Sequence, residues 1–533
     1  MKKNYLILLY FSSFIAFSQV PNIQWQNKIG GGLDDYFNDS DKTIDGGIII
    51  GGQSTSNISG DKTENCKGGS DYWIVKINNF GNVVWDKTIG GSNPNFYEND
   101  VFTCLKATLD GGYLVAGVSN SPISADKTIN SFNNSDDFWL LKLNELGVIQ
   151  WQRVFGGNLV DVPTNILNTS DGGSIIIGYS DSNISGNKTE NSKGLIDVWI
   201  LKLDNLGNIL WQKTIGGENL DSAECVVETS DGGYLIGANS LSNISGDKTE
   251  NSKGLRDMWI IKIDSIGNIL WQKTIGGNDT DYILNIIPKS NNFILVGSSK
   301  SNISGDKTEN SRGGFDCWIM EIDSTGIIIW QKTIGGNNDD TFGYIINSND
   351  GNYILSGSSS SNISGEKTEN SKGGFDAWIM KINPTGNIIW QKTIGGNNLD
   401  GLFAISQEVD NSFLLTGVSN STISGDITEN PIGGLDYWIL KLEPESLSIN
   451  ENNSLSSVQI YPNPTTNSIT VNFGAFQETA SVSIINVVGQ LISRQTFSQI
   501  SEQQLQINEP NGIYFLEIEN ENQQKKVFKI IKN

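Results

Sequence analysis

The side chains available for catalysis are limited, because the 533 residues include no histidine. This excludes Ser-His-Asp and Cys-His nucleophile pairs, histidine-ligated zinc and histidine general bases. Paired carboxylates remain possible, since two acidic groups suffice to hydrolyse a glycosidic bond. Acidic residues recur just before segments with strand character that contain a tryptophan, at Asp197, Asp257, Asp316, Asp376 and Asp436. Such recurrence favours a structural cap or turn, and no singular acidic pair stands out.

The most uniform stretch of the chain is a loop that begins Asn-Ile-Ser-Gly at Asn243 and has near copies at Asn57, Asn183, Asn302 and Asn362. Its oxygen-bearing side chains could bind Ca²⁺ on one face of the molecule. The candidate ligands are Asp61, Glu64, Asn65, Asp247, Glu250 and Asn251. The loop lacks the D-x-D-x-D spacing typical of calcium sites and contains lysines, so a hydrogen-bonded surface loop is the alternative. We expect no other cofactor.

Four cysteines, Cys66, Cys104, Cys225 and Cys317, are too few to stabilise a chain of this length as a disulfide framework. They do not occupy equivalent places in the repeat described next. Cys66 with Cys104 is the pair to test if a disulfide forms.

Fourteen tryptophans reveal a tandem repeat, because they form two interleaved series with a step close to 60 residues. The first series is Trp25, Trp85, Trp151, Trp211, Trp271, Trp330 and Trp390. The second is Trp73, Trp139, Trp199, Trp259, Trp318, Trp378 and Trp438. These indoles could stack on sugar rings, but packing between repeats is the favoured interpretation, since fourteen equivalent ligand sites would be hard to explain.

Each repeat contains four segments rich in β-branched and aromatic residues, which predicts four strands. In one copy the segments are 208–215, 222–229, 233–240 and 257–264. The turns Ser230-Asp231-Gly232-Gly233 and Ser265-Ile266-Gly267-Asn268 are typical of hairpins. Two hairpins per repeat predict a four-stranded sheet, which is the blade of a β-propeller.

The two ends of the repeat array each carry an unpaired strand. Pairing of 22–28 with 438–442 would complete a last blade and remove two exposed strand edges. We therefore predict an all-β chain with a seven-bladed propeller of four-stranded blades, closed by its N-terminal strand.

The N-terminus has the pattern of a signal peptide. Lys2 and Lys3 precede an apolar run, and small residues lead to a cleavage site between Ser18 and Gln19. The run is too short to cross a membrane as a helix, and we expect no transmembrane span. A net charge of −23 disfavours nucleic acid as a partner. The predicted domains are a signal peptide (1–18), the propeller (19–443), a linker (444–456) and a C-terminal domain (457–533).

The C-terminal domain alternates short strands, predicted at 458–464, 468–473, 480–492, 511–519 and 525–533. Its motif residues are Tyr461, Pro462, Asn463, Pro464, Asn486, Gly489, Gly512, Tyr514 and, in a basic ending, Lys529. In this order they resemble the type A C-terminal sorting domain of the bacterial type IX secretion system. The resemblance implies a small β-sandwich, recognition by the type IX machinery, and clipping with release or attachment to lipopolysaccharide. The propeller part resembles DGGY-type repeats, for which the resemblance implies no activity.

The leading hypothesis is an exported, non-catalytic propeller at the cell surface or in the medium, acting as an adhesion scaffold for a glycan or protein ligand. The alternative is a polysaccharide-active enzyme of the glycoside hydrolase type, with carboxylates in the central channel. A third class is a spacer or shield. A copy that departs from its siblings at an acidic position would favour the enzyme. The second copy deviates most, with extra residues within 92–100 and with Ile129.

Overall fold

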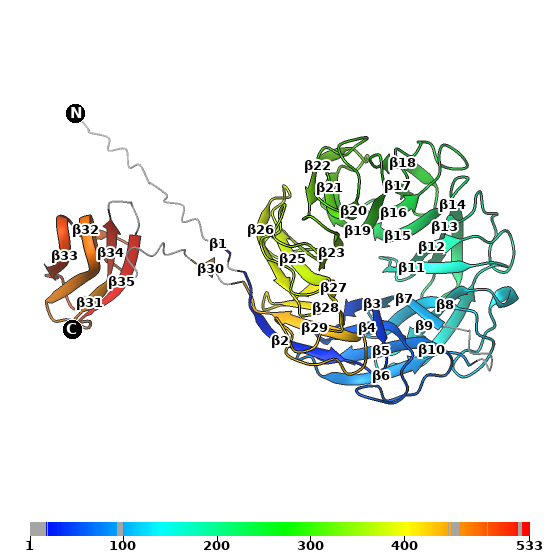
Figure 1. Ribbon diagram of the computed structural model, residues 1–533, viewed down its shortest axis with the longest axis horizontal. Coiled ribbons are helices and arrows are strands. Elements are labelled where there is room, and N and C mark those ends of the chain that lie inside the picture. The colour runs from blue at the N-terminus through cyan, green and yellow to red at the C-terminus, as the bar shows by residue number, and fades with distance from the viewer. Residues whose placement is uncertain are drawn as a thin grey trace. The chain divides into compact units, whose positions relative to one another are not determined.

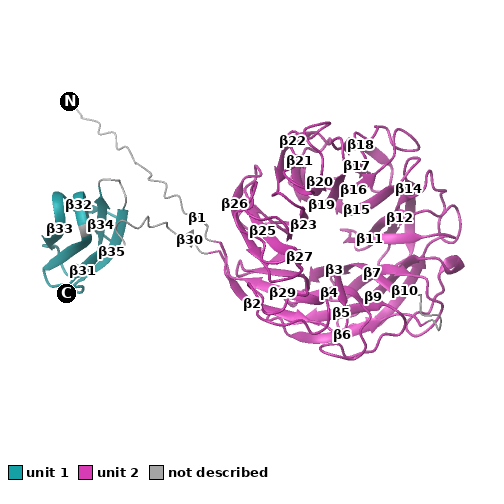
Figure 2. Cartoon of the chain, in the orientation of Figure 1, with its two compact units in different colours: residues 1–19, 446–533 teal, residues 20–445 magenta. Residues whose placement is uncertain are grey.

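The computed structural model describes residues 17–18, 20–92, 100–445, 447–448, 458–487, 489–520 and 525–533. The chain divides into two compact units (Figure 2), one of residues 20–445 and one of residues 1–19 and 446–533. The predicted signal peptide lies outside the described residues except for 17–18, where β1 (Phe17–Ser18) pairs with β30 (Leu447–Ser448). No helix within the described ranges has the length and apolar character to span a bilayer.

Residues 20–445 form seven four-stranded antiparallel sheets arranged in a ring (Figure 1), which confirms the predicted propeller. Residues of the innermost strands line a central channel. The innermost strands are β3 (Asp35–Lys42), β7 (Asp100–Ala107), β11 (Asp161–Asn168), β15 (Asp221–Glu228), β19 (Asp281–Lys289), β23 (Asp340–Asn347) and β27 (Asp400–Gln407). The second strands are β4 (Ile48–Ser54), β8 (Tyr113–Ser119), β12 (Ser174–Ser180), β16 (Tyr234–Ser240), β20 (Asn292–Ser299), β24 (Tyr353–Ser359) and β28 (Phe413–Ser419).

The third strands are β5 (Asp71–Ile77), β9 (Asp137–Leu143), β13 (Asp197–Leu203), β17 (Asp257–Ile263), β21 (Asp316–Ile322), β25 (Asp376–Ile382) and β29 (Asp436–Leu442). The outer strands are β6 (Val83–Ile89), β10 (Ile149–Phe155), β14 (Ile209–Ile215), β18 (Ile269–Ile275), β22 (Ile328–Ile334), β26 (Ile388–Ile394) and β2 (Ile23–Ile29). A short 3₁₀ helix, η1, spans Phe132–Asn134. We number the blades 1 to 7 in the order of their innermost strands.

The ring closes as the sequence predicts. The N-terminal strand β2 pairs antiparallel with β29, so that Lys28 lies opposite Trp438 and Trp25 lies opposite Lys441. The sheet β27-β28-β29-β2 is therefore blade 7, and it combines the two ends of the repeat array. Closure removes the free strand edges that an open array would expose.

The core of the propeller lies between neighbouring blades. The tryptophans of the third strands are fully buried, and one hydrophobic cluster joins Ile177 of blade 3 to Ile236 and Trp259 of blade 4. In most blades the buried indole N–H donates to a glutamine on the outer strand, as from Trp259 to Gln272 at 2.9 Å. The outer-strand tryptophans also link blades, since the indole N–H of Trp211 donates to the Ser265 carbonyl of the next blade. These contacts confirm the packing role.

Tight turns join the strands where the sequence places them. Gly232 has φ of +77° and Gly267 has φ of +89°, values that glycine adopts without steric cost. Where the turn has lost its glycine, Ser290 and Asn411 adopt φ of +53° and +64°. The turn aspartates bind a lysine of the third strand, as Asp231 binds Lys262 at 3.0 Å.

A buried cation lies inside every blade, between the aspartates that begin its first and third strands. In blades 1 to 6 it is a loop lysine, as with Lys62, which is 1% exposed and interacts with Asp35 and Asp71. In blade 7 this loop position is Ile427, and the cation is Lys28 of β2, which interacts with Asp400 and Asp436. The other five loop lysines are Lys127, Lys188, Lys248, Lys307 and Lys367. Blade 7 thus keeps the cation but supplies it from the closing strand.

All four cysteines are free thiols. The Cys66 thiol donates to the carbonyls of Ser54 and Ser56, while Cys104 is buried on β7. Cys66 and Cys104, the pair to test, are not joined in this structure, because Cys66 is engaged within blade 1 and Cys104 packs between blades 2 and 3.

The C-terminal unit is a five-stranded antiparallel sheet around its own core, formed by β31 (Gln459–Tyr461), β32 (Ser468–Asn486), β33 (Leu491–Gln506), β34 (Gly512–Asn520) and β35 (Lys525–Lys532). The segments predicted as two strands, 468–473 and 480–492, form mainly one long strand, β32, with a register shift between Asn472 and Gln477. Most of β33 was not predicted, because its largely exposed polar residues hide the alternation.

The propeller extends two residues beyond its predicted end at 443. Glu445 binds Lys381, and it accepts a hydrogen bond from the indole N–H of Trp390 at 2.8 Å. These contacts attach the start of the predicted linker to blade 6. The remainder of the linker, apart from 447–448, lies outside the described residues.

Candidate functional site

The loops proposed to bind calcium use their polar atoms within the protein. The Asp61 carboxylate accepts a hydrogen bond from Gly30 N–H, and the Asn65 side chain accepts one from Ile58 N–H. Their counterparts behave alike, since Asp247 accepts from Gly216 N–H and Asn251 from Ile244 N–H.

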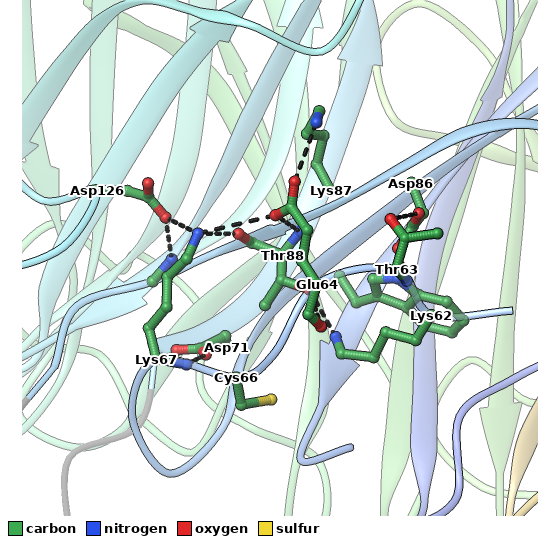
Figure 3. A network of polar contacts seen from close by, with 12 residues as sticks. Lys62, Thr63, Glu64, Cys66, Lys67, Asp71, Asp86, Lys87, Thr88 and Asp126 are labelled. Atoms are coloured by element: carbon green, nitrogen blue, oxygen red, sulfur yellow. Dashed lines mark hydrogen bonds and ion pairs between the residues drawn. The ribbon is translucent and has the colours of Figure 1, made fainter. Parts of the chain in front are cut away.

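The remaining candidate ligand, Glu64, joins the loop to the outer strand of its blade (Figure 3). Its carboxylate accepts hydrogen bonds from Lys87 Nζ at 3.0 Å and Thr88 N–H at 3.1 Å. Lys67 extends the network to Asp126 in blade 2. Glu250 accepts corresponding bonds from Lys273 and Thr274. In this structure the loop therefore connects neighbouring blades.

These carboxylates have protein donors, and the described ranges hold no group of three acidic, cysteine or histidine side chains placed to bind a metal ion. Calcium binding by the loops stays a prediction, which a titration must decide.

The aspartates that precede the tryptophan strands cap the same loops from inside. Asp257 is buried and accepts a hydrogen bond from the N–H of Lys253, and Asp197 accepts one from Lys193 N–H. Burial raises the pKa of Asp316 and Asp436 to about 6, and that of Asp137 to about 8. Their role is structural, as their recurrence predicts.

Singular acidic residues do occur on the channel wall, which sequence reasoning missed. The channel contains a cavity of about 530 Å³ whose lining includes Asp39, Asp41 and Glu224. Burial raises the pKa of Asp39 to about 7 and also raises that of Glu224. Alignment of the seven innermost strands finds Asp39 and Asp41, since the other six copies have no acidic residue at either position.

Both aspartates hold blades 1 and 2 together. Asp39 accepts a hydrogen bond from Leu105 N–H and Asp41 one from Ala107 N–H, each at 3.0 Å. Asp41 also pairs with Lys106 at 3.1 Å. The pair therefore joins two neighbouring inner strands.

A second blade-specific feature is an aromatic groove beside the channel on blades 5 to 7. It consists of Tyr282, Leu284, Phe315, Phe375, Leu399 and Phe403. Its four aromatic side chains are half-buried, and the rings of Tyr282 and Phe315 lie 5.6 Å apart at 45°. Two cavities of about 370 and 350 Å³ share the lining residues Phe315, Thr341 and Phe403.

The groove residues occupy repeat positions that differ from blade to blade. The position of Phe403 is Thr103 in blade 2 and Thr164 in blade 3, while Phe315 corresponds to Asp136 and Ile196. The signal was present in the sequence as aromatic substitutions in the last three copies. Because the surrounding blade framework is repeated, these substitutions distinguish one rim of the channel from the rest.

The motif of the C-terminal unit is brought together at β35. Asn463 donates to the Lys529 carbonyl at 2.7 Å and accepts from Ile531 N–H at 2.9 Å. This fixes the segment that contains Tyr461, Pro462 and Pro464 beside the final strand. Elsewhere, Gly489 has φ of +80° in the turn after Asn486.

Two further motif residues lie at the start of β34. Gly512 pairs with Lys532, and the Tyr514 hydroxyl donates to the Pro510 carbonyl at 2.6 Å.

Known proteins resemble this chain at low sequence identity. One curated relative, the regulatory protein FlaEY of Caulobacter vibrioides, is 22% identical over 275 residues, which cover 46% of this chain. The chain spans only 28% of that protein's length.

Two solved structures resemble the chain at low similarity. Drosophila Plexin A in complex with Semaphorin 1b matches at 7% identity and TM-score 0.41, covering 83% of this chain and 90% of the plexin chain. A Synechocystis apocarotenoid oxygenase mutant matches at 10% identity and TM-score 0.37, covering 77% and 97%. Neither likeness bears on function.

The C-terminal unit, in contrast, matches a family. Residues 459–533 match the model of the secretion system C-terminal sorting domain, and the match begins at β31 and runs to the end of β35. These residues therefore form a type IX secretion sorting domain, which directs export to the cell surface or into the medium.

Proposed function

We propose that the propeller is a non-catalytic adhesion module, exported through the type IX route, that binds a partner at the aromatic groove on blades 5 to 7. The observation that carries the proposal is the contrast between a repeated framework and a blade-specific rim. Four half-buried aromatic side chains beside two cavities form the kind of concave, mostly apolar surface at which ligands bind.

The partner is a glycan or a protein. Sugar rings stack on coplanar aromatic surfaces, whereas the rings of Tyr282 and Phe315 are tilted by 45°. This tilt favours a side chain inserted into the groove over a flat polysaccharide surface. Signal-peptide cleavage after Ser18 and attachment to lipopolysaccharide after C-terminal processing belong to the same proposal.

A polysaccharide-active enzyme is the second candidate, supported by Asp39, Asp41 and Glu224 on the channel wall. A carboxylic acid with a pKa of about 7, as for Asp39, suits a general acid. Against this candidate, Asp39 and Asp41 already accept hydrogen bonds from the backbone of β7.

One experiment separates the two candidates. The purified chain is mixed with insoluble polysaccharides or with intact cells, its depletion from solution is measured, and new reducing ends are counted. Depletion without reducing ends supports the binding module. Reducing ends that disappear in Asp39→Asn overturn it in favour of the enzyme. Absence of both signals on every surface argues against adhesion and leaves the spacer class.

A further inference from the structure

Two cations lie on the rim of the groove, each over an aromatic ring. Lys300 Nζ lies 4.1 Å from the centre of the Phe315 ring, and the Arg256 guanidinium lies 5.4 Å from that of Tyr282. Within the described part of the chain, neither side chain forms an ion pair within 4.0 Å, although the charge of Arg256 partly opposes the rise that burial causes in the pKa of Glu224. Both are specific to their blades, since the Arg256 position is Ser70 in blade 1.

The cavity beneath these cations lies mainly between blades 5 and 6 and has a volume of about 350 Å³. Its lining is Tyr282, Leu284, Ser298, Phe315, Thr341, Gly343 and Phe403, which includes no carboxylate. Asp339 lines the neighbouring cavity, where it accepts a hydrogen bond from Phe315 N–H. An anionic group is therefore favoured on the Lys300 side of the groove.

The lining also contains an uncommitted polar group. Ser298 is 3% exposed, and its hydroxyl has no hydrogen-bond partner among the described residues. A buried hydroxyl without a partner is costly, and a ligand group that reaches this point would satisfy it.

We propose that this cavity binds an acidic peptide segment of a partner protein, with an aromatic or large aliphatic side chain in the cavity and a neighbouring carboxylate on Lys300 and Arg256. The proposal rests on the proposed function and specifies the chemistry of the partner. The apolar lining takes the side chain, and the two cations take the carboxylate. The cations are held over aromatic rings, so their positions are set before a ligand binds.

Small probes test this chemistry in the full chain. Anilinonaphthalene sulfonate supplies an aromatic body with an anion, and N-phenylnaphthylamine is its uncharged counterpart. We expect anilinonaphthalene sulfonate to bind with enhanced fluorescence and to be displaced by N-acetylphenylalanine. N-acetylphenylalaninamide, which lacks the carboxylate, should compete about tenfold less well. Displacement by cellohexaose but not by N-acetylphenylalanine overturns the proposal in favour of a glycan.

Variants locate the probe and separate charge from shape. A Cβ added at Gly343, which lines this cavity and the channel cavity, meets no atom within 4 Å, and we expect Gly343→Phe to abolish binding of both probes by filling the space. Phe403→Ser is the second cavity variant, and Thr164→Ala is the matched control on blade 3. The double variant Arg256→Glu, Lys300→Glu should weaken anilinonaphthalene sulfonate about tenfold and leave N-phenylnaphthylamine unchanged.

The outcomes also distinguish this inference from the proposed function. Loss of both probes in Gly343→Phe, with no discrimination by charge, refutes the acidic partner but keeps the groove as a binding site. Unchanged binding of both probes in Gly343→Phe and Phe403→Ser refutes the cavity itself. Adhesion is then judged by depletion on surfaces, which does not depend on the probes.

Discussion

Replacing Lys28 tests how the ring is closed. Lys28→Thr gives β2 the residue that five of the other six outer strands carry at this position, but it leaves Asp400 and Asp436 without a cation. Breaking a buried ion pair by removing one partner costs about 3–5 kcal/mol. In a unit of this size 1 kcal/mol corresponds to about 1–2 °C, so we expect the unfolding temperature to fall by about 3–10 °C.

The cost should depend on pH. Burial raises the pKa of Asp436 to about 6, and the charge of Lys28 opposes that rise. Without Lys28 the pKa of Asp436 rises further, so the carboxyl is neutral at pH 5 and is forced towards ionisation at pH 8. The destabilisation should therefore be larger at pH 8 than at pH 5.

The arrangement in blade 1 indicates which second substitution should restore the stability lost in Lys28→Thr. There the cation comes from the loop, with Lys62 Nζ 2.7 Å from the Thr88 hydroxyl. Adding Ile427→Lys to Lys28→Thr rebuilds this arrangement in blade 7 and should recover most of the lost stability. Ile427→Lys alone places two ammonium groups together and should destabilise. Lys273→Thr, which removes a partly exposed pair with Glu250, is the control, with a loss below about 1 kcal/mol.

Tryptophan fluorescence during thermal unfolding reports this unit alone, because all fourteen tryptophans lie between residues 25 and 438. If Lys28→Thr is as stable as the parent, or if the double variant is no more stable than Lys28→Thr, then Lys28 does not replace the missing loop lysine of blade 7 and does not stabilise the closed ring.

Three further predictions follow from the same contacts. Burial raises the pKa of Asp137 from 3.8 to about 8, so the contribution of this group to stability is complete below pH 3.8 and is lost as the pH rises through 8, at about 1.4 kcal/mol per pH unit. Asp137→Asn should therefore flatten the fall in unfolding temperature between pH 5 and 8. The same substitution at the exposed Asp204 should not. Asn463→Ala removes two hydrogen bonds and should destabilise the sorting domain by about 1–3 kcal/mol, seen by circular dichroism, with tryptophan fluorescence unchanged. If the loop carboxylates are committed to protein donors, millimolar calcium should move the unfolding temperature by less than about 2 °C, and a larger rise would establish the calcium sites.

Sequence reasoning predicted the propeller because its signals are local and repeated. The strand predicted at 257–264 is β17, Asp257–Ile263, and the turn glycines have the positive φ that their positions require. Ring closure followed from two unpaired ends.

The features that were not predicted depend on comparing the copies of the repeat with one another, or on how consecutive blades converge in the ring. The exchange of Lys28 and Ile427 is visible only when the loop and the outer strand of blade 7 are aligned with their siblings. The groove joins Tyr282, Phe315 and Phe403, which are far apart in the sequence and meet because consecutive blades converge at the channel. The largely polar sequence of β33 lacks the alternation of apolar and polar residues that predicts a strand.

The binding role of the groove is tested most directly on whichever surface depletes the chain from solution. Phe315→Ser with Phe403→Ser should lose at least about tenfold in affinity for that surface, since two aromatic contacts are removed. Thr103→Ala with Thr164→Ala should bind as the parent does. Equal binding by the groove variant and the parent would contradict the account and move the binding site elsewhere on the propeller.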